Sequence, residues 1–177
     1  MNCRLLALLL LTLTPALAHA GLLDNIEHKA EKKVETSARA SGNKKIAAQV
    51  NKRLLAESRK NQCSFQSGTD KLAPGCDTKA KRLANVIIDV KKSLQAKGYS
   101  GFTFVVTGHT DSSGNAAANM KLSQRRAEVM VRKLISKGVH PQDIKAIGMG
   151  SKHMLVKPDN TPAKRARNRR YEVEVRF

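Results

Sequence analysis

The sequence predicts an α+β domain in which a layer of helices packs on a mixed four-stranded sheet, with a helical arm before it. Apolar residues recur at helical spacing in two stretches and alternate at strand spacing in two others. A stretch that is rich in Lys, Glu and Ala and lacks proline comes before them. After this arm we expect the order strand, helix, strand, helix, strand, strand, which makes a two-layer helix and sheet sandwich.

The first twenty residues have the features of a secretory signal peptide. One positive charge at Arg4 precedes the apolar run 5–13, and Ala18-His19-Ala20 is a small-residue cleavage site. The apolar run is too short for a permanent transmembrane helix. Cys3 stands before this run, which argues against a lipoprotein anchor. We therefore expect a mature chain that begins near Gly21 and enters the periplasm.

The chain is strongly basic, with 33 Lys and Arg against 14 Asp and Glu. Loss of Arg4 with the signal peptide lowers the formal net charge from +19 to +18. Such a charge attracts polyanions. Export favours the anionic cell envelope as the partner. Two Tyr, four Phe and no Trp are too few for a base-stacking platform, so nucleic-acid binding is not predicted.

Residues 21–60 form the predicted arm. Apolar residues recur about every four positions on both sides of Ser41-Gly42-Asn43: Ile26, Ala30, Val34, Ile46, Val50 and Leu54. This spacing predicts two amphipathic helices or one broken helix. The apolar stripe is thin. It could pair with another chain, including a second copy, or pack on the domain, while the charge pattern favours a solvated helical spacer.

Residues 62–177 form the predicted domain, which opens with a short strand at 62–66. A helix follows over 77–97, because Asp77 can cap its start, apolar residues recur at helical spacing, and Gly98 ends it. Phe102, Phe104 and Val106 then alternate with Thr103, Val105 and Thr107, which predicts a strand over 102–107 with at least one buried face. A polar loop, 108–115, connects this strand to the next helix.

The second half of the domain follows the same logic. Helical spacing of apolar residues predicts a helix over 116–137 that stops at Gly138, and a short strand follows at 143–148. Residues 149–162, with two prolines, are expected to form a loop. Apolar and charged residues alternate over 169–177, which predicts a last strand with one solvated face.

Two cysteines, Cys63 and Cys76, remain after removal of the signal peptide. An even pair in an exported protein predicts a disulfide. Closing a loop of this size stabilises the fold by about 3 kcal/mol in the chain-entropy model. A metal site with His109 or His153 is the alternative, but the spacing matches no known Cys/His zinc pattern.

The run GHTDSSGNAAANMKLSQRRA at 108–127 carries the candidate site. Asp111 follows a buried strand, in a loop that opens a helix whose free N–H groups attract carboxylates. Asn119 and Arg126 are seven residues apart and so share one stripe of that helix. Arg126 can hold a carboxylate through two hydrogen bonds, and Asp111 can accept from an ammonium. This pairing suits a zwitterionic ligand such as an amino-acid head group.

Two other interpretations of the run remain. Asp111 could merely cap the loop while Arg126 pairs with Asp111 or Glu128 on the surface. His109 invites a catalytic triad, which we reject because a triad needs its His between nucleophile and acid, and adjacent loop residues point in different directions. A buried, hydrogen-bonded structural His fits better. We predict no enzyme, no metal and no cofactor.

Residues 102–127 closely resemble the core motif of OmpA-like domains, as found in OmpA tails, Pal lipoproteins and MotB stators. The matching residues are Gly108, His109, Thr110, Asp111, Gly114, Asn119, Leu122, Ser123, Arg126 and Ala127. The closing segment with Arg165, Asn168, Arg169 and Arg170 resembles the family's GRxxNRR. The resemblance implies binding of the meso-diaminopimelate stem peptide of peptidoglycan.

The resemblance also implies residue roles. Asp111 and Arg126 stand at the two principal ligand positions and Asn119 at a supporting one, and Thr110, Ser123 and Arg165 complete the expected ligand-binding set. Some positions depart from the family pattern. Lys164 replaces a Gly, Leu155 or Val156 stands where a Pro is common, and Gln66-Ser67-Gly68 replaces an Asp-rich turn that often contacts the ligand.

We therefore expect a non-enzymatic peptidoglycan-binding protein of the periplasm, associated with the cell wall or the outer membrane. The basic arm adds attraction to the anionic envelope. The first alternative is an envelope scaffold whose helical arm docks a partner complex. The second is a charge-driven binder of lipopolysaccharide or nucleic acid, whose binding falls steeply with salt and ignores Asp111.

Overall fold

The computed structural model describes residues 16–66 and 68–177, with side chains except those of residues 16–28 and 30. The charged start and apolar run of the predicted signal peptide lie outside these residues. The chain divides into two compact units, residues 1–42 and 43–177. No helix in the described part has an apolar stretch long enough to cross a membrane.

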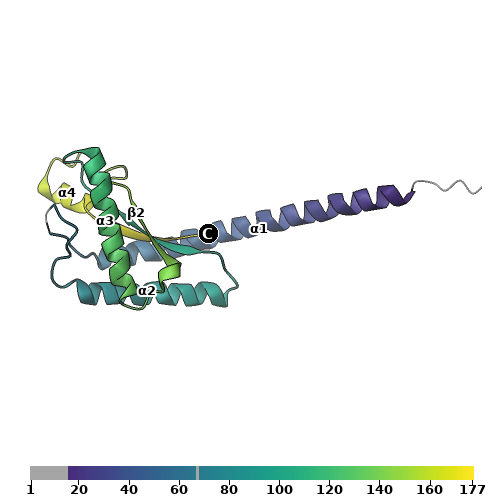
Figure 1. The fold of residues 1–177 in the computed structure, drawn as a ribbon, viewed down its shortest axis with the longest axis horizontal. Helices are drawn as coiled ribbons and strands as arrows, with labels where there is room; N and C mark the ends of the chain where they lie inside the picture. The colour runs from purple at the N-terminus through teal and green to yellow at the C-terminus, as the bar shows by residue number, and fades with distance from the viewer. Residues whose placement is uncertain (1–15, 67) are drawn as a thin grey trace, which may run out of the picture. The chain divides into compact units, whose positions relative to one another are not determined.

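Helix α1 runs from Ala16 to Lys60 and includes the predicted arm (Figure 1). It passes through Ser41-Gly42-Asn43 without a break, so the expected interruption is wrong. These residues cost a helix about 1 kcal/mol or less each, which the neighbouring good helix formers offset. Residues 31–41 are all exposed, and Val34 keeps 69% of its surface in solvent.

The part of α1 that belongs to the second unit is packed on the domain. Ile46, Ala47 and Val50 are partly buried against the core, and Leu54 is fully buried. The favoured solvated spacer therefore does not describe this part of the helix. The compact unit begins at Asn43, ahead of the boundary near residue 62 that the sequence suggests.

The sheet has three strands, β1 (Thr103–Gly108), β2 (Ile144–Gly148) and β3 (Tyr171–Arg176), in the order β2-β1-β3. Strand β1 is parallel to β2 and antiparallel to β3, so the sheet is mixed, as predicted. The prediction of a fourth strand is wrong. Residues 62–66 contribute only an isolated bridge between Phe65 and Leu72.

Side-chain amides occupy the edge of β3 where a fourth strand would pair. Gln62 donates to the Tyr171 carbonyl at 2.6 Å and accepts from its N–H at 3.2 Å. Asn51 of α1 does the same at Val175, at 3.1 and 2.7 Å. On the opposite edge, Gln124 accepts from the Gly148 N–H of β2 at 2.6 Å and donates to the Ala146 carbonyl at 3.4 Å.

Helices α2 (Cys76–Ala96) and α3 (Ala116–Ile135) lie close to their predicted positions. Asn115 caps α3 by accepting from the N–H groups of the second and third residues after it. Asp77 does not cap α2, because the helix begins one residue earlier. Its carboxylate instead forms ion pairs with Lys133 of α3, at 2.9 Å, and with Lys137 just after that helix, at 2.6 Å.

Two short helical elements lie where the sequence predicts none. A 3-10 turn, η1 (Pro141–Asp143), precedes β2, and helix α4 (Pro162–Asn168) precedes β3. Proline at a first helical position after a Thr161 cap explains the start of α4. Their short length leaves no periodicity from which a sequence pattern could predict them.

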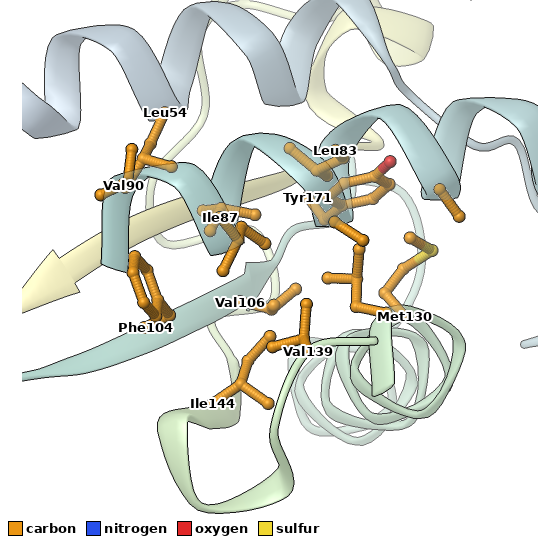
Figure 2. Packing of buried hydrophobic residues seen from close by; sticks show 14 of the residues in the cluster. Leu54, Leu83, Ile87, Val90, Phe104, Val106, Met130, Val139, Ile144 and Tyr171 are labelled. Atoms are coloured by element: carbon orange, nitrogen blue, oxygen red, sulfur yellow. The ribbon is translucent and has the colours of Figure 1, made fainter. Parts of the chain in front are cut away.

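One apolar core joins the helices to the sheet. Figure 2 shows Leu83, Ile87 and Val90 of α2 gathered with Phe104 and Val106 of β1. Helix α3 packs on β1 and β2 (Figures 1 and 2). The predicted disulfide between Cys63 and Cys76 is present and closes the segment that leads into α2.

Candidate functional site

Two strand-terminal glycines set the distance between α3 and the sheet. A Cβ atom added to Gly108 would lie 2.3 Å from the Ser123 carbonyl oxygen, and one added to Gly148 would lie 2.4 Å from the Gln124 nitrogen. The backbone of α3 therefore needs glycine at both positions. This close approach places the loop after β1 and the start of α3 around one site.

Asp111 lies in that loop with 6% of its surface exposed. One carboxylate oxygen accepts hydrogen bonds from the Ser113 N–H, at 3.1 Å, and from the Ser113 hydroxyl. The other accepts from Arg169 at 2.7 Å. Burial disfavours ionisation, but the bonds from Ser113 and Arg169 outweigh it and hold the pKa of Asp111 below its usual value.

Arg126 projects from α3 and is 7% exposed. Its Nε donates to the Thr69 carbonyl at 2.9 Å, and its guanidinium lies over the Phe65 ring, 5.1 Å from the centroid. Burial, and then the charge of Arg169, lower its pKa. No carboxylate in the described residues lies within 4.0 Å of Arg126, so it does not pair with Asp111 or Glu128.

Asp111 and Arg126 line the same pocket, which has a volume of about 960 Å³. Thr110, Asn119 and Arg165 line it too. The Asn119 amide donates to the Ser113 carbonyl at 2.8 Å and so supports the loop. The Thr110 hydroxyl is buried and has no hydrogen-bond partner among the described residues. The structure thus brings five of the six expected residues together.

Ser123 is the exception. It is fully buried and is not part of the pocket lining. Its hydroxyl donates to the Met120 carbonyl at 2.8 Å and accepts from the Gly150 N–H at 2.8 Å. The side chain therefore joins α3 to the loop after β2, and both of its hydrogen-bonding roles are taken by backbone groups.

His109 lines the pocket and is almost completely buried. Burial and the charge of Arg170 lower its pKa to about 4, so it is neutral at pH 7. Its Nε2 lies 3.8 Å from a Glu172 oxygen, but neither ring nitrogen has a hydrogen-bond partner in the described residues. The expected burial is found, and the expected hydrogen bonds are not.

Asp159, in the loop before α4, forms hydrogen bonds with the loop that carries Asp111. Its carboxylate accepts from the Ser112 N–H at 2.9 Å, from the Ser112 hydroxyl, and from Asn168 at 3.0 Å. The bonds from Ser112, followed by the bond from Asn168, lower the pKa of Asp159 to about 2. Asp159 therefore stays ionised and holds two loops of the site together over the neutral pH range.

The sequence prediction omitted several residues of the pocket wall. Arg169 belongs to the closing motif, but its ion pair with Asp111 joins positions 58 residues apart. Spacing along the chain gives no signal for such a contact. Further lining residues come from the end of α1, from the disulfide loop, from α4 and from the link between α4 and β3: Arg59, Cys63, Phe65, Arg167 and Arg170.

The fold and the site define a small α+β domain whose pocket is lined by a buried acid, Asp111, and a buried arginine, Arg126. Residues 64–169 match the family model described as "OmpA family", which is more than half of the chain. The chain therefore belongs to the OmpA family. The described residues contain no group of three or more potential metal ligands.

Relatives with curated names support this membership. Outer membrane protein A of Bordetella avium is 42% identical over 81 residues, which are 46% of this chain and 41% of that protein. The probable lipoprotein YiaD of Escherichia coli is 33% identical over 115 residues, 65% of this chain and 48% of YiaD. The peptidoglycan-binding protein ArfA of Mycobacterium tuberculosis is 36% identical over 70 residues, 40% of this chain and 21% of ArfA. The chain spans less than half the length of each.

Solved structures share the fold. The peptidoglycan-associated lipoprotein of Burkholderia pseudomallei superposes with a TM-score of 0.53 at 22% identity, over 65% of this chain and 89% of that one. The C-terminal domain of Helicobacter pylori MotB gives 0.53 at 22% identity, over 66% and 84%. The name of outer membrane protein A refers to the outer membrane, and another solved structure with this fold is the periplasmic domain of Helicobacter pylori MotB, so proteins similar to this chain are found in the bacterial envelope.

Proposed function

We propose that this protein binds peptidoglycan non-covalently through the diaminopimelate stem peptide and catalyses no reaction. The observation that carries the proposal is the shared pocket of Asp111 and Arg126, two buried groups of opposite charge. The names of two similar proteins, peptidoglycan-binding protein ArfA and a peptidoglycan-associated lipoprotein, support it.

The buried arginine is the carboxylate receptor in this proposal. A buried charge without a counter-ion is costly, and a ligand carboxylate would remove that cost. The Nε of Arg126 is already bonded to Thr69, so its two Nη groups remain to hold both oxygens of the carboxylate. The Phe65 ring below the guanidinium keeps its plane fixed.

Asp111 is the ammonium receptor. Its current partner, Arg169, is 43% exposed and can turn toward solvent when a ligand ammonium arrives. The Ser113 bonds keep the Asp111 carboxylate ionised and oriented during this exchange. The side-chain end of diaminopimelate carries one ammonium and one carboxylate and so satisfies both receptors.

Co-sedimentation with purified sacculi tests the proposal. Asp111→Asn and Arg126→Gln should each remove most of the sedimented protein, because each leaves one ligand charge unpaired. Asp89→Asn and Arg132→Gln are matched controls, since both residues are exposed on helices α2 and α3 and neither lines the pocket. If the two site variants sediment like the controls, the site assignment is wrong.

Stem-peptide titration tests the ligand. A peptide with lysine in place of diaminopimelate lacks the side-chain carboxylate, so it leaves Arg126 unpaired. We expect it to bind at least about tenfold more weakly, as one lost charge-assisted hydrogen bond is worth about 1.5–3 kcal/mol. Many sites on the wall then add avidity to a modest single-site affinity.

The arm suggests a second, accessory role. Residues 21–42 contain four basic and four acidic residues, whereas residues 43–60 contain six basic residues and one acidic residue. Attraction to an anionic envelope surface would therefore come from the packed part of α1, while the exposed residues 31–41 are suited to contacts with a partner complex. Deleting residues 21–42 should leave sacculus binding intact if the pocket alone carries it.

A further inference from the structure

The pocket carries far more positive charge than one zwitterion can balance. Six arginines line it in the described part of the chain: Arg59, Arg126, Arg165, Arg167, Arg169 and Arg170. Asp111 is the sole acidic residue among the lining residues that the structure describes. His109 adds no charge at neutral pH, since its pKa is about 4. The ligand should therefore bring more than one negative group.

Three of the six arginines have carboxylate partners. Arg169 pairs with Asp111 at 2.7 Å. Glu172, just outside the lining, pairs with Arg170 at 2.7 Å and lies 3.9 Å from Arg59. Arg126, Arg165 and Arg167 are the uncompensated arginines, since no carboxylate oxygen in the described residues lies within 4.0 Å of them.

The uncompensated arginines differ in burial. Arg126 is buried, Arg165 is partly exposed, and Arg167 is exposed, the last two on the short helix α4. Arg165 donates to the main-chain carbonyl of Asp159 at 3.3 Å. No carboxylate oxygen in the described residues lies within 4.0 Å of either α4 arginine. Cationic groups therefore extend from the deep end of the pocket to its mouth.

The volume of the pocket agrees with an extended ligand. Pockets of about 300–1,000 Å³ typically enclose a drug-sized molecule, and this one measures about 960 Å³. A single amino-acid head group would fill only a small part of it. A ligand that places its zwitterion on Asp111 and Arg126 has room to continue toward α4.

We propose that Arg165 and Arg167 form a second anion subsite, so that the pocket selects peptide ends bearing one ammonium and two free carboxylates. This inference rests on the proposed function and narrows its ligand class. A stem whose second carboxylate has been converted to an amide loses that charge. The protein then distinguishes stems with a free terminal carboxylate from amidated or otherwise capped ones.

Calorimetry with two matched peptides tests the subsite. The tripeptide L-alanyl-γ-D-glutamyl-meso-diaminopimelate is used once with its terminal carboxylate free and once with that group as the carboxamide. The intact chain should bind the acid about five- to tenfold more tightly, as expected for one charge-assisted contact at a partly solvated site. Equal affinity for both peptides overturns the proposal.

Variants assign the preference to α4. The double substitution Arg165→Gln and Arg167→Gln should bind acid and amide alike, whereas Arg165→Lys with Arg167→Lys should retain the preference. Arg132→Gln, on α3 outside the pocket, controls for general loss of charge. A glutamine variant that keeps the full preference overturns the assignment. If it does not fold, as judged by circular dichroism, the comparison of the two peptides on the intact chain decides.

Failure here is distinguishable from failure of the proposed function. Suppose that Asp111→Asn and Arg126→Gln lower the affinity for both peptides while the intact chain binds acid and amide equally. The proposed peptide binding is then supported, and the second subsite is wrong. If these two variants bind both peptides as tightly as the parent, the pocket is not the binding site, and the proposed second subsite is wrong as well.

Discussion

The carboxylate of Asp111 accepts a hydrogen bond from Arg169 at 2.7 Å, in the pocket that is also lined by Arg126, which has no carboxylate within 4.0 Å in the described part of the chain. The charge of Asp111 is therefore already balanced before a ligand arrives, while that of Arg126 is not. A ligand ammonium must replace Arg169, whereas a ligand carboxylate meets an unoccupied receptor. This difference makes the anionic end of the ligand the stronger anchor.

Replacing Arg169 with Gln should raise the pKa of Asp111, because the substitution removes one of the interactions that favour its ionised form. Stability that Asp111 contributes is present above the ordinary pKa of an aspartate and is lost as pH falls through the lowered value. The variant should lose it at higher pH. NMR titration of the Asp111 carboxyl carbon measures the shift. An unchanged midpoint would mean that Ser113 alone sets this pKa.

The disulfide should support ligand binding as well as stability. The segment between Cys63 and Cys76 carries both contacts to Arg126, the Thr69 carbonyl and the Phe65 ring. Changing both cysteines to alanine should lower the free energy of unfolding by about 3 kcal/mol in the chain-entropy model. It should also weaken stem-peptide binding under conditions in which both proteins are folded. Peptide affinity that survives the double substitution would show that the loop does not position Arg126.

Gly108 should tolerate no side chain. Alanine there would place Cβ 2.3 Å from the Ser123 carbonyl oxygen, so α3 must move, at an overpacking cost of about 1–3 kcal/mol. Because α3 carries Arg126, peptide binding should fall too. Gly42→Ala is the control, since nothing lies within 4 Å of the added atom and the position is helical. Thermal unfolding of both variants checks this, and equal melting temperatures would contradict it.

Asp77 should make the free energy of unfolding of the domain depend on pH in the acidic range. Hydrogen bonds from Lys137 and Lys133 lower its pKa to about 2 from the usual 3.8. The contribution is fully present above pH 3.8 and is lost as pH falls toward 2. Asp77→Asn should therefore be less stable than the parent at pH 7 and equal to it near pH 2. Chemical denaturation at several pH values measures the difference, which should also shrink in high salt.

Local patterns predicted most of the fold. Alternating residues identified β1 and β3, and helical spacing identified α2 and α3, each with an end near a glycine. The prediction of a fourth strand was wrong because Asn51 and Gln62 occupy the edge of β3. These contacts join residues that are more than one hundred positions apart in the sequence. No local pattern encodes such a contact.

The candidate site was predictable where the chemistry is local to one loop and one helix. Thr110, Asp111, Asn119 and Arg126 share a pocket, as their order along the chain suggests. Ser123 belongs to the same motif, but it faces the loop after β2 and bonds to backbone groups. Arg169 remained outside the predicted set because only the folded chain brings it to Asp111.

The amide side chains that bond to the backbones of the outer strands affect how the protein behaves at high concentration. Exposed sheet edges are templates on which strands of other molecules polymerise. Here Gln62 and Asn51 on one edge, and Gln124 on the other, each already hold both a donor and an acceptor of the strand backbone. An incoming strand would have to displace them, so the domain resists aggregation through sheet extension.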